Sequence, residues 1–233
     1  HVRPHDKQDR EVMLLCGGPS LADSIDEIRK LRAEGAGLVT VNGAYGWALE
    51  HGLEPSAQSV LDARAFNSRF TTPVTSYTKY LIASQAHPST LDGLPRERTY
   101  LWHSGLSTEN EALARKASDG LYFPIPGGST VALRALPLLR LLGFWRIHLF
   151  GFDSCVRDAS HHAYDQAEND AEPLVPVALA GRVFQCTPWQ VSQATEFRDL
   201  VAFLGDEMEC AVHGDGLIAT LIKTGAELKL QEA

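Results

Sequence analysis

The chain alternates between short apolar runs and amphipathic stretches. An apolar run of roughly four to eight residues bounded by turn residues is typical of a buried strand, and apolar residues at three- and four-residue spacing are typical of a helix. Near the start of the chain, the apolar run 12–16 is followed by an amphipathic stretch that ends at Gly35. This pattern predicts a strand and then a helix, because glycine commonly ends helices.

The same pattern continues along the chain. It predicts strands at 12–16, 38–41, 57–61, 80–84, 99–103, 121–125, 146–150, 183–186 and 209–212. It predicts helices at 21–34, 45–50, 109–117, 130–142, 189–204 and 217–223. Ser20 is the expected N-cap of the first helix, with Asp23 three residues on as in a capping box. Pro137 lies inside the fourth helix, where we expect a kink or a later start.

Strands that alternate with helices predict an α/β fold with a mostly parallel sheet and helices on both faces. A length of 233 residues suits one large domain of this class or two small ones. We expect an N-terminal tail at 1–10 and a single domain at 11–233. Residues 154–180 are polar and lack a clear period, so we expect a long loop or lid there.

Small or polar residues follow five of the predicted strands. They occupy positions 17–20, 42–43, 62–64, 127–130 and 151–153. In open parallel sheets, ligands bind outside the carboxyl ends of the strands. We therefore expect the five segments to meet in one ligand crevice.

Two of these segments combine small residues with the start of a helix. They are Gly17, Gly18, Pro19 and Ser20, and Gly127, Gly128, Ser129 and Thr130. Exposed amides and the helix dipole favour an anion at such a place, so the two loops would hold the ends of a nucleotide diphosphate or triphosphate. A plain turn explains the first loop equally well, and helix caps explain the second. The first loop has neither the Walker nor the GxGxxG pattern.

Polar side chains at the other strand ends add candidate ligands. Asp62 and Asp153 are carboxylates of the kind that hold Mg²⁺ beside phosphates or hold sugar hydroxyls. Asn42 offers a donor and an acceptor, which suits a base or a sugar. The alternatives are loop aspartates or helix caps, and an Asn-Gly turn.

Histidines and a tryptophan supply further candidate chemistry. His161 and His162 lie in the polar stretch and suit a general acid or base, or an anion site when charged; a solvated loop is the alternative. Trp189 begins a helix and can stack on a base, although packing is the commoner fate of tryptophan. The four cysteines are dispersed and form no CxxC pair, which argues against zinc and against a disulfide framework.

Composition and charge narrow the class of protein. Hydrophobic residues make up 44% and charged residues 21% of the chain, as in ordinary globular proteins. The formal net charge of -8 argues against a general nucleic-acid binder, although it leaves a local basic groove open. No signal peptide is evident, and the apolar stretch 131–152 is too interrupted by charge to span a membrane. We expect a cytoplasmic protein, and a homo-oligomer stays open.

Four stretches, taken together and in order, resemble a known family. They are LLCGGPSL at 14–21, VNGAYGWAL at 41–49, SVLDARAF at 59–66 and GGSTVALRALPLLRLLGFWRIHLFGFD at 127–153. The combination is similar to that of the MptE-like 6-hydroxymethylpterin diphosphokinase family, which is distantly similar in layout to bacterial lipooligosaccharide sialyltransferases. The resemblance covers roughly residues 11–225 and implies a Rossmann-like fold and a nucleotide-dependent transferase.

By this resemblance, the expected reaction moves diphosphate from ATP, with Mg²⁺, to a hydroxymethyl group on a heterocycle such as a pterin or a modified base. The implied metal ligand is Asp62 or Asp153, and His161 or His162 would close over the acceptor hydroxyl. The amides implied to hold phosphates belong to Gly17, Gly18, Ser20, Gly128 and Ser129.

Two other functions stay open. One is a glycosyltransferase that uses a nucleotide sugar in the same crevice, and the other is a non-catalytic nucleotide-binding module. The sialyltransferases carry a histidine just before the helix that corresponds to the one beginning near Trp189 here. In this chain, residues 184–188 contain no histidine.

Overall fold

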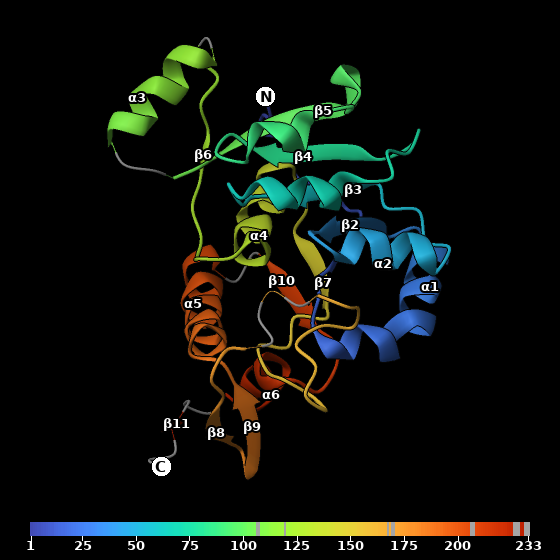
Figure 1. The fold of residues 1–233 in the computed structure, drawn as a ribbon, viewed down its shortest axis with the longest axis vertical. Coiled ribbons are helices and arrows are strands. Elements are labelled where there is room, and N and C mark those ends of the chain that lie inside the picture. Colours follow the sequence, from blue (N-terminus) through green and yellow to red (C-terminus); the bar gives the residue numbers. More distant parts are fainter. Residues whose placement is uncertain are drawn as a thin grey trace.

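The computed structural model describes residues 1–105, 108–118, 120–166, 168, 171–205, 208–225 and 229–230. Its centre is an eight-stranded sheet of order β10-β7-β1-β2-β3-β4-β5-β6, in which each neighbouring pair runs parallel (Figure 1). The strands are β1 (Val12–Leu15), β2 (Gly37–Val41), β3 (Ala57–Val60), β4 (Lys79–Ala83), β5 (Thr99–Ser104), β6 (Pro124–Ile125), β7 (Arg146–Phe150) and β10 (Glu209–Val212). The predicted α/β fold with a parallel sheet is confirmed.

Each predicted helix also has a counterpart. The α-helices are α1 (Ile25–Ala33), α2 (Ala44–Glu50), α3 (Thr108–Ala117), α4 (Val131–Leu141), α5 (Pro188–Leu204) and α6 (Leu217–Thr224). Short 3-10 helices are η1 (Pro19–Ser24), η2 (Ala65–Thr71), η3 (Pro88–Leu91) and η4 (Arg96–Arg98). Within the described part of the chain, no helix is both long and apolar enough to cross a membrane.

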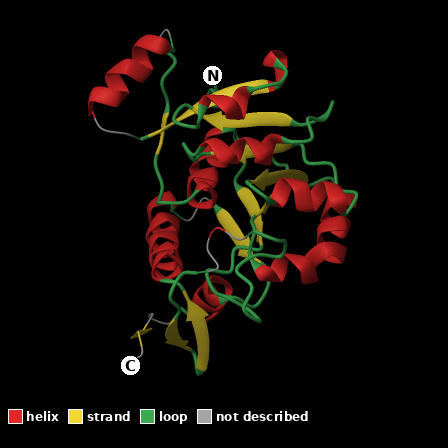
Figure 2. Cartoon of the chain, in the orientation of Figure 1, coloured by secondary structure: helices red, strands yellow, loops and turns green. Residues whose placement is uncertain are grey.

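Helices cover both faces of the sheet, as Figure 2 shows. Every residue of β1, β2 and β3 is buried, because a parallel strand with helices on both sides has no solvent face. Successive side chains of β1 point to opposite faces of the sheet. Met13 and Leu15 pack with residues of α1 and α2, whereas Val12 and Leu14 belong to the larger core that includes α4, α5 and α6.

One prediction about a helix start is wrong, and a second is narrowed. Ser20 makes no capping hydrogen bond: a 3-10 turn comes first and α1 begins only at Ile25, because the Ser20 hydroxyl donates to Asp153 instead. Of the kink or later start expected from Pro137, the later start is not seen, since α4 runs through this residue from Val131, and the kink stays a prediction. Thr130 caps that helix by accepting from the Leu133 N–H.

The predicted loop at 154–180 contains a strand at its end. β8 (Val175–Leu179) pairs antiparallel with β9 (Arg182–Cys186) and with β11 (Lys229–Leu230) in a small second sheet. Ala180 and Gly181 form the hairpin turn with φ of 51° and 77°, the left-handed pair that a tight two-residue hairpin needs. β8 has the apolar sequence VPVAL, but Pro176 within this short run argues against a strand, so the local pattern does not reveal it.

The first ten residues run along the main sheet. The Val2 N–H donates to the carbonyl of Leu101 at 2.9 Å, and the His5 N–H donates to that of Leu141 at 2.8 Å. The Val2 side chain is buried within the larger core.

Helix α5 offers a test of how the core supports the crevice. Phe197 is fully buried, and its ring meets that of Phe152, next to Asp153, edge to face with centroids 5.1 Å apart. We expect Phe197→Ala to lower the free energy of unfolding by about 3–5 kcal/mol, because it leaves a cavity in the core. Phe203→Ala, on the same helix but 69% exposed, is expected to stay within about 0.5 kcal/mol of the parent. Urea unfolding of both variants measures this, and equal losses would contradict it.

Candidate functional site

A cavity of about 660 Å³ opens at the carboxyl ends of β1, β2, β3 and β7. All five segments that follow the predicted strands reach it. The candidate residues that line it are Gly17, Gly18, Asn42, Asp62, Ser129, Thr130, Asp153, His161 and His162. Pro19, Ser20, Gly127 and Gly128 lie close in the chain but are not among its lining residues. The parallel topology therefore brings most of the candidates together.

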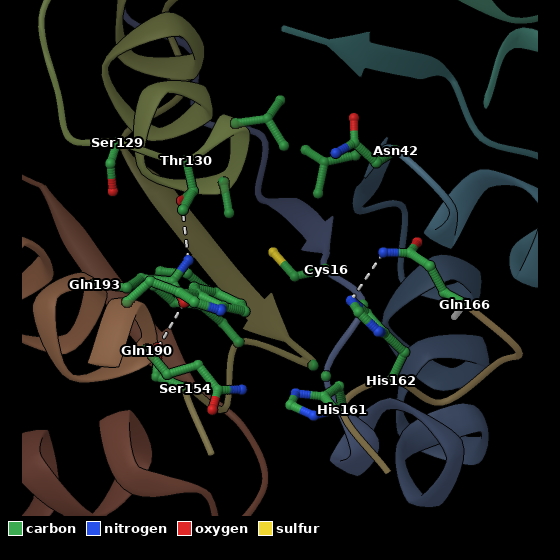
Figure 3. Close-up of a pocket in the computed structure, with 18 of the residues that line it drawn as sticks. Cys16, Asn42, Ser129, Thr130, Ser154, His161, His162, Gln166, Gln190 and Gln193 are labelled. Atoms are coloured by element: carbon green, nitrogen blue, oxygen red, sulfur yellow. Dashed lines mark hydrogen bonds between the residues drawn. The ribbon is translucent and has the colours of Figure 1, made fainter. Parts of the chain in front are cut away.

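Two walls face each other across this cavity (Figure 3). Ser129, Thr130 and Gln193 lie on the wall made by α4 and α5. Asn42 and His162 lie on the opposite wall, and Cys16 lies between the two walls. Residues 154–166, which we call the strap, carry both histidines and close one side of the cavity.

The loop after β1 uses two of its amides inside the protein. The Gly18 N–H donates to the carbonyl of Gly151 at 2.7 Å, and the Ser20 N–H donates to Oδ2 of Asp153 at 2.7 Å. The Ser20 hydroxyl donates to Oδ1 of the same carboxylate at 2.6 Å. The sequence predicts that these two amides hold phosphate, but in this structure both N–H groups are already bonded. A phosphate at Gly18 or Ser20 would have to displace the carbonyl of Gly151 or the carboxylate of Asp153.

Asp153 is a desolvated carboxylate at the floor of the cavity. Its side chain is almost fully buried, and burial raises the pKa of Asp153 above its ordinary value. The two hydrogen bonds from Ser20 lower this pKa, but burial outweighs them. Glycines make room for it: a Cβ on Gly18 would lie 2.6 Å from Oδ2, and one on Gly216 would lie 2.7 Å from the Asp153 Cα. A carboxyl group with a raised pKa suits proton transfer.

The loop before α4 is also engaged by the protein. The Ser129 N–H and hydroxyl both donate to Oε2 of Glu196, each at 2.9 Å. A carboxylate of this chain therefore occupies the place that the sequence assigns to phosphate, in keeping with the preference of a helix start for negative charge. Thr130 accepts from Nε2 of Gln193 at 2.9 Å, and Gln193 accepts from the Ser154 hydroxyl at 2.7 Å.

Asp62 is paired with an arginine. Its carboxylate accepts from Nε of Arg64 at 2.8 Å and from Nη2 at 2.5 Å. Partial burial alone would raise the pKa of Asp62, but the hydrogen bonds and charge of Arg64 outweigh it and lower the pKa.

Asp62 and Asp153 do not fit a ready-made metal site. Both carboxylates already accept hydrogen bonds from this chain. Among the residues that the structure describes, no group of three or more His, Cys, Asp or Glu side chains is placed to hold a metal ion. The assignment of Mg²⁺ to these two residues stays a prediction.

The strap lies against the glycines of two strand ends. A Cβ on Gly43 would lie 2.5 Å from the Tyr164 ring, and one on Gly17 would collide with the Tyr164 hydroxyl. The Ala163 N–H donates to the carbonyl of Gly17 at 2.9 Å. The absence of a side chain at these two glycines therefore makes room for Tyr164.

The two strap histidines differ in their surroundings. His161 is buried, and its Nδ1 has no hydrogen-bond partner among the described residues. His162 is half-buried, lies with Nε2 3.3 Å from Nε2 of Gln166, and stacks on Tyr164 with centroids 5.5 Å apart. Both rings line the cavity, as a general acid or base would have to.

Asn42 adopts the left-handed conformation with a φ of 45°, which asparagine tolerates better than most residues. Its side-chain Oδ1 is buried and has no partner among the described residues. A buried acceptor left unpaired costs about 1–3 kcal/mol, so a ligand N–H or O–H at this atom would relieve that cost.

Sequence reasoning missed several polar residues of the cavity. Gln190, Gln193 and Ser154 line it, beside the half-buried Trp189. A signal for Gln190 was present, because Thr187 and Gln190 form the capping box that starts α5. Cys16 also lines the cavity, but burial, and secondarily the charge of Asp153, raises the pKa of its thiol strongly, which disfavours the reactive thiolate.

Comparisons with known proteins agree with this layout. A family model described as 6-hydroxymethylpterin diphosphokinase MptE-like matches residues 2–159. A solved structure of the MAf glycosyltransferase from Magnetospirillum magneticum AMB-1 superposes with a TM-score of 0.73 at 18% identity. The match covers 92% of this chain but only 33% of that protein, and at this identity it shows the fold alone. The search of curated proteins gives no match.

The buried carboxylate gives a prediction about pH. The raised pKa means that the folded protein binds a proton at Asp153 more tightly than the unfolded chain does. The stability gained from this proton is fully present below the ordinary pKa of about 4 and is lost as the pH rises through the raised pKa. We expect the free energy of unfolding of the parent, relative to Asp153→Asn, to fall with rising pH by at most about 1.4 kcal/mol per unit. Urea unfolding between about pH 4 and pH 8 measures the difference. Asp26→Asn, at a 96% exposed side chain, is the control, and parallel curves for parent and Asp153→Asn would contradict the prediction.

The contact between Gly43 and Tyr164 gives a second prediction. Gly43→Ala keeps a backbone that alanine adopts, with a φ of -63°, but places a methyl group against the Tyr164 ring. We expect faster hydrogen exchange at the Ala163 amide, because the strap must move. Gly46→Ala in the same helix meets nothing within 4 Å and should leave this exchange unchanged while stabilising the helix by up to about 1 kcal/mol. Equal exchange in the two variants would show that Tyr164 does not depend on the glycine.

Proposed function

Because the chain belongs to the MptE-like family of 6-hydroxymethylpterin diphosphokinases, we propose that it is a nucleotide-dependent transferase that acts in the cavity described above. The family implies a transferase with ATP as co-substrate. The proposed reaction moves diphosphate from ATP to a hydroxymethyl group on a heterocycle, such as a pterin or a modified base.

The cavity at the carboxyl ends of the parallel strands is the observation that carries this proposal. Its volume of about 660 Å³ falls in the range of roughly 300–1,000 Å³ that is usual for small-molecule sites. It lies where open parallel sheets bind their ligands, and strand ends from four neighbouring strands contribute to it.

In the proposed reaction, the acceptor hydroxyl oxygen forms a bond to the β-phosphorus of ATP. The bond from that phosphorus to the oxygen bridging it to the α-phosphorus breaks, and AMP leaves. The hydroxyl proton needs a base, and His161 and His162 are the histidines that line the cavity. Phosphoryl transfer depends mostly on positioning, which the two rigid walls would supply.

Uncharged polar groups would recognise the heterocycle. Asn42 offers a buried, unpaired acceptor, and Gln190 and Gln193 bring amide groups to the opposite wall. Trp189 lies beside them, half-buried, where a planar ring could stack.

A glycosyltransferase that uses a nucleotide sugar is the second candidate. The likeness of this fold to the MAf glycosyltransferase over 92% of the chain favours it. The amide groups of Gln190 and Gln193 on α5, together with the Ser154 hydroxyl that lines the same cavity, suit sugar hydroxyls. The third candidate is a non-catalytic nucleotide-binding module. It would bind a nucleotide in the same cavity without converting it to a product.

A ligand panel followed by product analysis tests the proposal. Thermal unfolding is measured with ATP, CMP, UDP and sugar nucleotides, each with and without Mg²⁺; a ligand at 100 times its Kd should add about 2.7 kcal/mol. With ATP and 6-hydroxymethyl-7,8-dihydropterin we expect AMP and a diphosphorylated pterin. Nucleotide release from a sugar nucleotide would support the glycosyltransferase instead, and binding without any product would support the module.

Substitution of His161 tests the role of the strap. We expect His161→Asn to lower the turnover of ATP by about 10²–10⁴-fold, as loss of a general base does, while ATP still binds. The matched control is His51→Asn at the C-cap of α2, whose ring stacks on Trp47 and is outside the cavity lining. Unchanged turnover in His161→Asn would remove this residue as the base and leave His162.

A further inference from the structure

Arg64 is the only arginine or lysine among the described residues that line the cavity. The carboxylates along the same lining belong to Asp62, Asp153 and Glu172. The other lining residues are neutral or histidine, so among the arginines, lysines and carboxylates of the lining only Arg64 attracts phosphate oxygens by opposite charge.

The Arg64 side chain is held from two directions. Its Nε and Nη2 donate to the Asp62 carboxylate, and its guanidinium lies over the ring of Phe66, 4.9 Å from the centroid. The side chain is nevertheless 61% exposed. Of the five N–H donors of the guanidinium, Asp62 takes those of Nε and one of Nη2, so Nη1 stays available. Such a fixed, accessible arginine loses little entropy when it binds an oxyanion.

A second arginine joins the same aromatic ring. Arg69 lies 5.3 Å from the centroid of Phe66 and 4.8 Å from that of Phe70. Its Nη2 pairs with Glu168 at 2.5 Å. Phe66 therefore lies within cation–π distance of both Arg64, the N-cap of η2, and Arg69, within η2; Arg64 lines the cavity, and Arg69 is outside its lining.

We propose that Arg64 and Arg69 form a subsite for phosphoryl oxygens at this edge of the cavity, and that it takes the polyphosphate of the donor nucleotide. The inference deepens the proposed function and rests on it. Asp62 is then a positioning residue that orients Arg64, and Glu168 occupies Arg69 until phosphate replaces it. The subsite supplies the cationic contact that the loop amides of Gly18, Ser20 and Ser129, already engaged by the protein, do not.

Calorimetry with inorganic tripolyphosphate, and separately with ATP, tests the subsite on the whole chain. We expect Arg64→Gln to weaken both by at least tenfold and Arg69→Gln by a smaller factor. The control is Arg198→Gln, an arginine about half exposed on α5 that pairs with Asp199 and does not line the cavity. Because these arginine side chains are exposed, unfolding midpoints should be unchanged. Equal affinities in the parent and in Arg64→Gln would overturn the proposal.

Two further ligands show whether the bound phosphate belongs to the donor nucleotide or to the acceptor. Adenosine should bind the parent and Arg64→Gln equally, because it lacks the polyphosphate. If Arg64→Gln instead weakens only the monophosphate of 6-hydroxymethylpterin and leaves ATP unaffected, the subsite belongs to the acceptor and the donor assignment is wrong. Tripolyphosphate binding through Arg64 without any transfer would leave the subsite standing while refuting the proposed reaction, so the two proposals fail separately.

Discussion

Asp153 accepts two hydrogen bonds from Ser20, one from the backbone and one from the hydroxyl, and these bonds join the ends of two neighbouring strands. β7 leads into Asp153 and β1 leads into the loop of Ser20, so the bonds set how the floor of the cavity is built. A carboxylate buried this deeply without partners would be very unfavourable. The glycines at 18 and 216 follow from the same constraint, because a Cβ at either would collide with Asp153.

The position of the strap likewise depends on glycines that lack a side chain. Tyr164 can lie over the ends of β1 and β2 only because positions 17 and 43 have no side chain. The small residues that look like room for a ligand are thus used by the protein itself, and the ligand space lies beside them, between the strap and the wall of α4 and α5. The histidines reach the cavity as a consequence of where Tyr164 holds the strap.

Acidic groups of the chain occupy places where an anion would be attracted. Glu196 binds the start of α4, Asp62 binds Arg64, and Glu168 binds Arg69. Each pair satisfies donors that would otherwise lack a partner. The pair of Arg69 with Glu168 is partly exposed, where ion pairs contribute only about 0–1 kcal/mol, so an incoming phosphate can replace the Glu168 carboxylate at little cost.

The sequence by itself determined the order of strands and helices, because apolar runs and amphipathic stretches are local signals. It also determined that the residues at 17–18, 42, 62, 129–130 and 153 would share one edge, since parallel strands place their carboxyl ends together. Only the tertiary structure decided which donors and acceptors pair. Ser20 and Asp153 are 133 positions apart, and Ser129 and Glu196 are 67 apart, so no local pattern connects them. β8 (VPVAL) is apolar, but it is short and contains Pro176, a residue that argues against a strand, and its partners β9 and β11 meet it only in the folded chain.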